Sequence, residues 1–360
     1  MSTPVDLFDY DLPAEYIAQE PMEPRDHSKL MVLGSKSGSI EHRQFDEIVN
    51  YLHAGDVLVF NDTRVFKARL KGKVTKVTDV TKAAEVEVFL LRAHGKVWEA
   101  LIRPGRKVDV GDVIDLGGLS TALKEKEKQG IVLLEFEVEP TEVLRFCDEH
   151  GSVPTPPYVK QVPDDLTTYQ TVYARETGSV AAPTAGFHFT DRLLDRLRNH
   201  GVQIEFVTLH VGIGTFQPVK TETLEEHEMH AEFVEIDQGT ADRINRAKDE
   251  GRRVVAVGTT TTRALEGVAR RTSHVASDEN DERLATSALR AYTGDVNIFI
   301  TPGYEFKIVD ALITNFHLPK STLLALVSAL AGRDHIMAAY EQAKNNDYRF
   351  YSFGDAMFIS

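Results

Sequence analysis

The alternation of apolar and polar positions divides the chain into two kinds of segment. Between residues 66 and 136, short β-branched runs such as ARLKGKVTKV and EVEVFLLRA alternate apolar with polar residues and are separated by Gly and Pro. This pattern is typical of antiparallel strands with one buried face, and it predicts a small barrel or sandwich. From about residue 155, helical segments such as TDRLLDRLRNHG alternate with apolar strands such as RRVVAVGTT, which favours α/β layers.

A further buried strand, DVLVF at residues 56–60, precedes the β-rich region. The simplest arrangement therefore has residues 1–65 and 152–360 forming one discontinuous α/β domain, with a mixed sheet and flanking helices. Residues 66–151 are then inserted as a small antiparallel β-barrel domain. The polar, charge-rich stretch at 269–287 predicts a mobile loop.

Composition narrows the class of protein. The chain has 360 residues, of which 42% are hydrophobic and 27% charged, and this suits a soluble protein of about two domains. Its one cysteine, Cys147, excludes an intramolecular disulfide and fits a reducing compartment. The acidic N-terminal stretch is unlike a secretion signal, and no apolar run reaches the roughly 18 residues of a membrane span. We therefore expect a cytoplasmic protein without membrane contact.

The charge is unevenly distributed. A net charge of -14 argues against a protein that coats nucleic acid indiscriminately. Between residues 66 and 110, however, eleven Lys and Arg residues stand against five Asp and Glu. Two interpretations remain open: a solvated strand surface whose lysines protect exposed edges, or a patch that faces phosphates.

Polar and small residues follow several apolar strands, at the sheet edge where open α/β sheets bind ligands. These strand ends are NDTR (61–64), HVGIGTF (210–216), GTTTTR (258–263) and TNFHLPKST (314–322). HVGIGTF is not a dinucleotide fingerprint, because Gln217 occupies the third glycine position and no helix follows. In GTTTTR, the threonines cap a helix that carries Arg263, which indicates either an anion cradle or a plain helix cap.

The last strand end has a second candidate anion site. Ser321 or Thr322 can cap the apolar helix that follows, and its free N–H groups beside Lys320 would hold a phosphate or a carboxylate. The glycines that wrap a triphosphate are missing, so the motif is not a P-loop and ATP is not implied.

Five histidines fall in these polar segments: His188, His210, His227, His230 and His317. His227 and His230 are three residues apart and would share one face of a helix, so a zinc site must be considered. The segment lacks the H-E-x-x-H form, and substrate hydrogen bonding or a structural role is favoured over metal binding. We expect no metal.

Many short strings, in order along the chain, resemble one enzyme family. They include FDYDLP, DVLVFNDTRV, GSVAAPTAGFHFT, TLHVGIGTFQPV, HEMHAE, VVAVGTTTTR, LITNFHLPKSTLL and FGDAM. Together they resemble the S-adenosylmethionine:tRNA ribosyltransferase-isomerases of queuosine biosynthesis. The likeness spans nearly all of the α/β part, whereas the β-rich insertion resembles the family mainly in position and length. Thr155 and Phe187 depart from the leucines expected there.

The resemblance implies that S-adenosylmethionine serves as a ribosyl donor. The acceptor would be 7-aminomethyl-7-deazaguanine at the tRNA wobble position, and the products epoxyqueuosine-tRNA, adenine and methionine. It implies no tightly bound cofactor beyond this co-substrate, and we expect a monomer. Its acid and base candidates are His188, His210 and His317. The expected substrate-binding residues are Asn61, Arg64, Pro183, Thr184, Gly186, Gly212, Gly214, Thr215, His227, His230, Glu232, Thr259, Arg263, Asn315, Lys320, Ser321 and Asp355.

Individual roles follow from this chemistry. Arg263, or Lys320 with Ser321, would hold the methionine carboxylate. The small residues of SVAAPTAGFHFT (179–190) would let backbone lie flat against the donor or the modified base, although a tight buried turn explains them as well. Two other functions remain: a tRNA-binding protein without activity, and a methyltransferase. The strand ends favour neither, because they are rich in His, Thr and Asn and the first strand lacks a glycine-rich loop.

Overall fold

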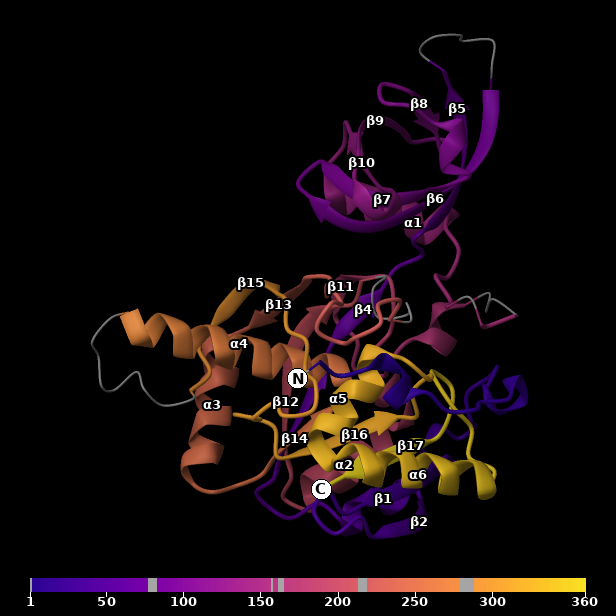
Figure 1. Ribbon diagram of the computed structural model, residues 1–360. Helices are drawn as coiled ribbons and strands as arrows, with labels where there is room; N and C mark the ends of the chain where they lie inside the picture. Colours follow the sequence, from indigo (N-terminus) through magenta and orange to yellow (C-terminus); the bar gives the residue numbers. More distant parts are fainter. Residues whose placement is uncertain (1, 77–82, 157, 161–164, 213–218, 279–287) are drawn as a thin grey trace. The chain divides into compact units, whose positions relative to one another are not determined.

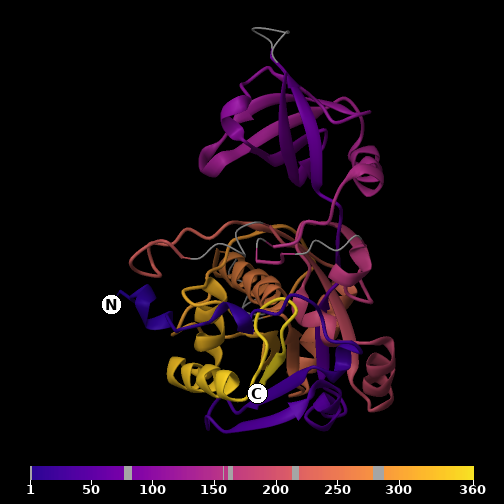
Figure 2. The ribbon, with the colours of Figure 1, turned by 90° about the vertical axis from the view of Figure 1, so that its right-hand side faces the viewer.

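The computed structural model describes residues 2–76, 83–156, 158–160, 165–212, 219–278 and 288–360. It divides the chain into two compact units (Figures 1 and 2). Unit 1 comprises Met1–Thr63, Thr171–Glu176 and Pro183–Ser360, and unit 2 comprises Arg64–Gln170 and Thr177–Ala182. Unit 2 contains all of the predicted insertion and continues past it.

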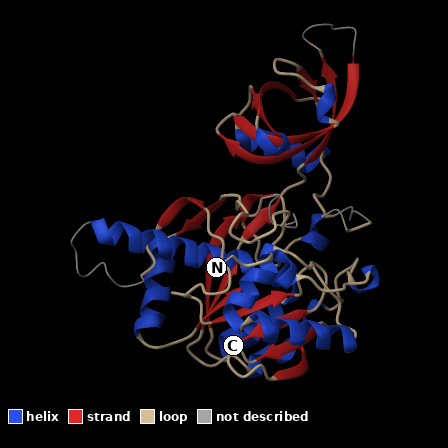
Figure 3. Cartoon of the chain, in the orientation of Figure 1, coloured by secondary structure: helices blue, strands red, loops and turns tan. Residues whose placement is uncertain are grey.

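Unit 1 is built on a nine-stranded mixed sheet, as the sequence predicts, with helices packed against it (Figure 3). Its central neighbours β12, β3, β14 and β16 run parallel, and β17 is parallel to β1 but antiparallel to β16. In spatial order the strands are β15 (Tyr292–Val296), β13 (Glu232–Ile236), β12 (Gln203–His210), β3 (Val57–Asn61), β14 (Val254–Val257), β16 (Ala311–Asn315), β17 (Ala356–Ile359), β1 (Lys29–Leu33) and β2 (Ile40–Gln44).

The central strands are mostly apolar, because protein covers both of their faces, and their polar residues lie at the carboxyl ends of β3 and β16. Every residue of β3, β14 and β16 is buried. On one face, Leu193 and Leu197 of α2 (Asp191–Asn199) join a core cluster with Phe60 and Ile313. Burial on this scale supplies the main driving force for folding.

Other helices complete unit 1. Helix α4 (Thr259–Asp278) contacts β3, β12, β14 and β16, and α3 (Gln238–Asp249) contacts β12 and β14. Helices α5 (Thr322–Ala331) and α6 (Arg333–Asn345) pack on each other. Short 3-10 helices are η1 (Val5–Phe8), η2 (Ala14–Tyr16), η3 (Arg25–His27), η4 (Phe45–Asn50) and η8 (Thr184–His188). In the described part of the chain no single helix could cross a membrane by length and composition; α5 and α6 pass that test together, with a 114° bend between them.

The predicted loop at 269–287 is wrong over its first half. Residues 269–278 continue α4. This stretch contains no Gly or Pro to end the helix, and Arg271 donates a hydrogen bond to the carbonyl of Asp295 on the neighbouring strand β15. Residues 279–287 lie outside the described part of the chain.

Unit 2 is a closed antiparallel barrel, as predicted. Alternate residues such as Leu70, Val88, Leu123 and Leu134 are fully buried inside it, as the period of two requires. The strands, in ring order, are β10 (Ile131–Phe136), β7 (Val97–Arg103), β6 (Ala83–His94), β5 (Arg69–Thr75), β8 (Val113–Asp115) and β9 (Ser120–Lys126). The unit also holds α1 (Pro140–His150), η5 (Gly105–Lys107), η6 (Lys128–Gly130) and η7 (Leu166–Tyr169). A separate two-stranded sheet pairs β4 (Thr63–Val65) with β11 (Glu176–Ser179).

Candidate functional site

Asn61 joins the ends of the central parallel strands. Its side chain mimics a peptide group: Oδ1 accepts from Leu209 N at 3.0 Å, and Nδ2 donates to Leu209 O at 2.9 Å. Oδ1 also accepts from Thr63 N, and Thr260 Oγ1 of α4 lies 3.5 Å from Nδ2. The side chain is fully buried, so it fixes the strand ends around the site and is itself largely satisfied by the chain.

Asn315, at the end of β16, orders a second group of predicted residues. Thr184 Oγ1 donates to its Oδ1 at 3.0 Å, and its Nδ2 lies 3.1 Å from His188 Nε2. Because an amide nitrogen can only donate, His188 Nε2 accepts, and the ring proton is on Nδ1. Nδ1 therefore donates to Ser28 Oγ at 2.7 Å. The predicted residues Thr184, His188 and Asn315 thus form one hydrogen-bonded chain.

His188 is a buried, neutral histidine. Its ring stacks on Phe45 with centroids 4.8 Å apart, and 4% of the residue is exposed. Burial lowers the pKa of His188 to about 3, and the nearby charges of Arg349 and Arg25 act in the same direction. With both nitrogens engaged, this ring is poorly arranged to exchange protons with a substrate.

His317 is in a similar position. Its backbone N–H donates to Tyr340 Oη at 2.9 Å, and the same hydroxyl is hydrogen-bonded to His317 Nδ1 at 3.1 Å. The other ring nitrogen, Nε2, is hydrogen-bonded to Thr314 Oγ1 at 3.1 Å. Burial lowers the pKa of His317 to about 3. Tyr10 further ties this segment down by donating to the His317 carbonyl.

His210 differs from both. It ends β12, is only partly buried, and its ring stacks on Phe233 with an interplanar angle of 15°. Thr63 Oγ1 lies 2.8 Å from Nδ1 and fixes the orientation of the ring. Of the three predicted acid or base candidates, His210 is the one whose ring lies near solvent at a strand end.

The two predicted carboxylate-binding cations are already paired within the chain. The guanidinium of Arg263 forms a buried ion pair with Glu232 and donates to the carbonyl of Ile298. Lys320 Nζ lies 2.8 Å from Asp6 Oδ1 and 3.1 Å from Asp9 Oδ2. Ser321 accepts from Leu324 N as the cap of α5, which leaves its hydroxyl in a structural role.

Two predicted residues stabilise turns at the site. Asp355 accepts from Lys29 N and from Arg349 N, so its carboxylate connects β1 to the turn before β17. Burial raises the pKa of Asp355, against the hydrogen bonds that lower it.

A Cβ added at Gly186 would lie 1.9 Å from Tyr173 Oη, so the small residues of 179–190 are explained at this position by close packing.

The remaining predicted residues are dispersed. His227 and His230 lie in a loop and not on a helix, and the pKa of His227 is lowered by burial and by His230. Thr259 is buried at the start of α4, Pro183 precedes η8, Gly212 follows β12, and Arg64 is exposed in unit 2. Gly214 and Thr215 lie outside the described residues. Among the described residues, no group of three or more His, Cys, Asp or Glu side chains could hold a metal ion.

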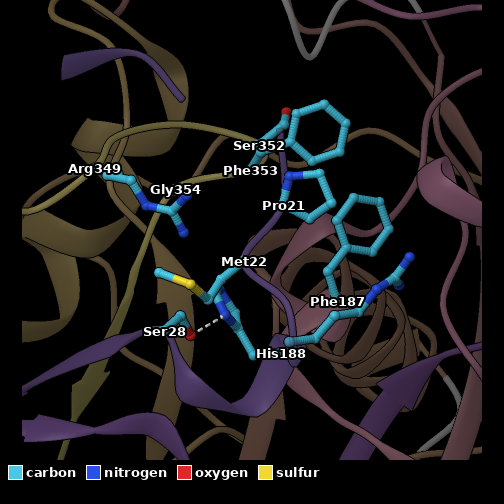
Figure 4. Close-up of a pocket in the computed structure, with 10 residues that line it drawn as sticks. Pro21, Met22, Ser28, Phe187, His188, Arg349, Ser352, Phe353 and Gly354 are labelled. Atoms are coloured by element: carbon cyan, nitrogen blue, oxygen red, sulfur yellow. Dashed lines mark hydrogen bonds between the residues drawn. The ribbon is translucent and has the colours of Figure 1, made fainter. Parts of the chain in front are cut away.

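A small cavity of about 10 Å³ adjoins His188 (Figure 4). This volume is enough for about one water molecule. Sequence reasoning missed most of its lining, because Ser28, Arg25 and Arg349 come from segments far from the strand ends that it searched. The lining residues are Pro21, Met22, Arg25, Ser28, Phe187, His188, Arg349, Ser352, Phe353 and Gly354.

These features define a class: an α/β protein with an inserted antiparallel barrel, whose polar groups gather at the ends of parallel strands. A family model described as queuosine biosynthesis protein matches residues 5–359. The chain belongs to this family, which confirms the resemblance seen in the sequence. A solved structure, the S-adenosylmethionine tRNA ribosyltransferase from Thermotoga maritima, is 38% identical, covers 98% of this chain and 100% of its own, and has a TM-score of 0.55.

The buried histidines predict a pH dependence of stability. Their folded pKa values, about 3, lie below the unfolded value of 6.5, so the unfolded chain binds more protons between these limits. The stability they contribute is present above pH 6.5 and decreases as the pH falls. His317→Gln should reduce the slope of unfolding free energy against pH between pH 6 and 4.5 by up to about 1.4 kcal/mol per pH unit.

Urea denaturation at several pH values measures this slope. His53→Gln is the matched control, because the His53 side chain is 72% exposed. Equal slopes for wild type, His317→Gln and His53→Gln would show that His317 is not held neutral in the folded protein.

Proposed function

We propose that this protein is an S-adenosylmethionine:tRNA ribosyltransferase-isomerase. The observation that carries the proposal is the 38% identity to a ribosyltransferase of that name over essentially both whole chains. The match of the queuosine biosynthesis family model from residue 5 to residue 359 supports it. The enzyme transfers the ribosyl group of S-adenosylmethionine to 7-aminomethyl-7-deazaguanine at the wobble position of tRNA. The products are epoxyqueuosine-tRNA, adenine and methionine.

This chemistry sets the demands on the site. The sulfonium acidifies the ribose 5′ C–H, so a base must remove that proton, and an acid must protonate the departing adenine. The amine of the modified base then attacks the sugar, which requires that both substrates be held in contact. The protein must therefore supply proton transfer, an orienting anchor for the donor, and exclusion of water.

His210 is our candidate for proton transfer. Its partly buried ring lies at the end of β12, stacked on Phe233 and hydrogen-bonded to Thr63, whereas burial lowers the pKa values of His188 and His317 to about 3. A histidine near neutrality exchanges protons most effectively when solvent or substrate can reach it. We assign the other two histidines to holding the strand ends in position.

Product analysis tests the reaction. With tRNA that carries the aminomethyl-deazaguanine base, the protein should release adenine and methionine in equal amounts from S-adenosylmethionine. We expect this without added metal ion or nucleoside triphosphate, and liquid chromatography of the quenched reaction measures it. Formation of S-adenosylhomocysteine would indicate methyl transfer, and no turnover would indicate a binding protein. Activity abolished by chelation and restored by zinc would contradict the metal-free reaction.

Single-turnover kinetics test the role of His210. His210→Gln should lower the rate of the chemical step by about 100-fold or more. His188→Gln and His317→Gln should lower it less, through the position of neighbouring groups, and His53→Gln should leave it unchanged. A near-normal rate for His210→Gln would place the acid and base on other residues.

The barrel carries the basic stretch for which a patch that faces phosphates is one of the two open interpretations. Its cations are interleaved with carboxylates: Lys71 lies opposite Glu87, Lys73 opposite Glu85, and Arg103 opposite Glu87. These five residues, with Asp115, line a hollow of about 620 Å³. Between residues 64 and 170 the chain has 17 basic and 17 acidic residues. The excess of positive charge between residues 66 and 110 is therefore balanced by acidic residues elsewhere in unit 2. A phosphate contact here remains part of our proposal.

A salt series tests this interaction with tRNA. Replacing Lys71, Lys73, Arg103 and Arg106 with Gln should weaken tRNA binding and flatten its dependence on salt, by about one unit of slope for each phosphate that is no longer neutralised. Because three of these cations face carboxylates, the slope should change by fewer than four units. Donor binding should not change. The matched control replaces Lys124, Lys126, Lys128 and Arg145. An unchanged slope in the first variant would show that the basic stretch is a solvated strand surface.

We further propose that S-adenosylmethionine is used as a co-substrate without a tightly bound cofactor, and that the enzyme acts on tRNA as a cytoplasmic monomer. The single cysteine supports a reducing compartment. Burial raises the pKa of the Cys147 thiol to about 12, so this cysteine is not a reactive thiolate.

A further inference from the structure

The donor carries a carboxylate on its methionyl part, and the enzyme needs a cation or aligned N–H groups to hold it. The predicted cations Arg263 and Lys320 are both paired with carboxylates of the chain. An ion-paired arginine that is fully buried would have to leave its partner unpaired in order to bind a ligand, which is strongly unfavourable. Arg263 is therefore unsuited to bind the carboxylate, and Lys320 would have to exchange Asp6 and Asp9 for it, so a cation whose donors lack acceptors suits the carboxylate better.

Arg349 has the hydrogen-bonding capacity that these residues lack. Its Nη1 donates to the carbonyl of Glu20 at 3.3 Å. Its Nε and Nη2 are buried and have no hydrogen-bond partner among the described residues. The nearest carboxylate oxygen, Oδ1 of Asp355, is 3.7 Å from Nη2, which is too long for a hydrogen bond. Two buried donors of one guanidinium group thus lack an acceptor in the described part of the chain.

Asp355 holds Arg349 in place without satisfying it. The two oxygens of Asp355 accept from Lys29 N at 2.9 Å and from Arg349 N at 2.8 Å. The Asp355 carboxylate thereby holds the backbone of Arg349 in position. Unpaired buried donors are rare in native proteins, because each costs free energy that a hydrogen bond would recover. An anionic ligand would supply that bond.

The surroundings of Arg349 suit an anion attached to an apolar chain. Arg349 lines the cavity together with Arg25, whose guanidinium lies 5.2 Å from the centroid of the Phe187 ring. Phe187 stacks on Phe353, with centroids 5.9 Å apart, and Met22 forms a further apolar wall (Figure 4). Each guanidinium has one carboxylate near it, with Arg25 Nε 4.0 Å from Glu23 Oε1 and Arg349 Nη2 3.7 Å from Asp355 Oδ1, and neither distance is that of a hydrogen bond.

We propose that Arg349, supported by Arg25, binds the carboxylate of the methionyl part of S-adenosylmethionine. This inference rests on the proposed function. The carboxylate takes the water-sized space beside the free edge of Arg349, and the methylene groups lie against Phe187, Phe353 and Met22. Met22 is 36% exposed and unbranched, so it can move aside as the donor enters. A phosphate of tRNA is the other anion that this chemistry accepts, and the test separates the two.

Calorimetric titration of wild type and Arg349→Gln with two ligands tests the proposal. The ligands are S-adenosylmethionine and its decarboxylated analogue, which lacks only the carboxylate. We expect Arg349→Gln to weaken the binding of S-adenosylmethionine by about 10- to 100-fold. Binding of the decarboxylated analogue should change less than about threefold, which also shows that the variant is folded. Arg349→Lys, which keeps the charge but not the two-donor edge, should lie between them.

The matched control is Arg198→Gln, an exposed helical arginine of the same unit that pairs with Asp195. It should leave the binding of both ligands unchanged. Equal losses for the two ligands in Arg349→Gln would overturn the assignment of the carboxylate. A loss of tRNA affinity with unchanged donor binding would assign Arg349 to a phosphate instead. If wild type bound no S-adenosylmethionine at all, the proposed function itself would fail.

Discussion

The site depends on one constraint. Where the parallel strands end, the hydrogen bonds between them stop, and the backbone N–H and C=O groups beyond that point need other hydrogen-bond partners. Asparagine meets this demand because its side chain carries both halves of a peptide group. Asn61 bonds to both backbone groups of Leu209, and Asn315 connects Thr184 to His188. These hydrogen bonds attach the loops to the ends of the strands and thereby fix the positions of the loops.

This rigidity has a chemical consequence. A polar group that is used to fix the strand ends is not available to a substrate. His188 and His317 are held neutral, with both ring nitrogens engaged, and Arg263 and Lys320 are neutralised by carboxylates. We propose His210, at the end of β12, for proton transfer and the buried Nε and Nη2 donors of Arg349 for binding the carboxylate of the donor. Positioning and reactivity are thus divided between different residues.

The two units differ in where they place their polar and charged side chains. Unit 1 buries its central strands from both faces and places polar groups at their ends, which suits a pocket for small reactants. Unit 2 closes a barrel, which removes free strand edges, and it distributes cations and carboxylates alternately over its surface. A large RNA substrate needs contacts beyond the reacting nucleoside, and our proposal assigns some of these contacts to the barrel.

The sequence alone determined the layer architecture, the inserted barrel and the family, because these depend on local periodicity and on short motifs that occur in fixed order. It also identified the strand ends DVLVFNDTRV and LITNFHLPKST, where polar residues follow apolar runs. It could not distinguish a histidine that reacts from one that holds a loop, because that difference lies in partners such as Ser28 and Tyr340, which are remote in the chain. Arg349 was missed for the same reason: its lack of an acceptor becomes visible only when Glu20, Asp355 and the arginine are brought together in space. Residue type and spacing fix what a side chain can do, and only tertiary packing decides which hydrogen bonds are already made.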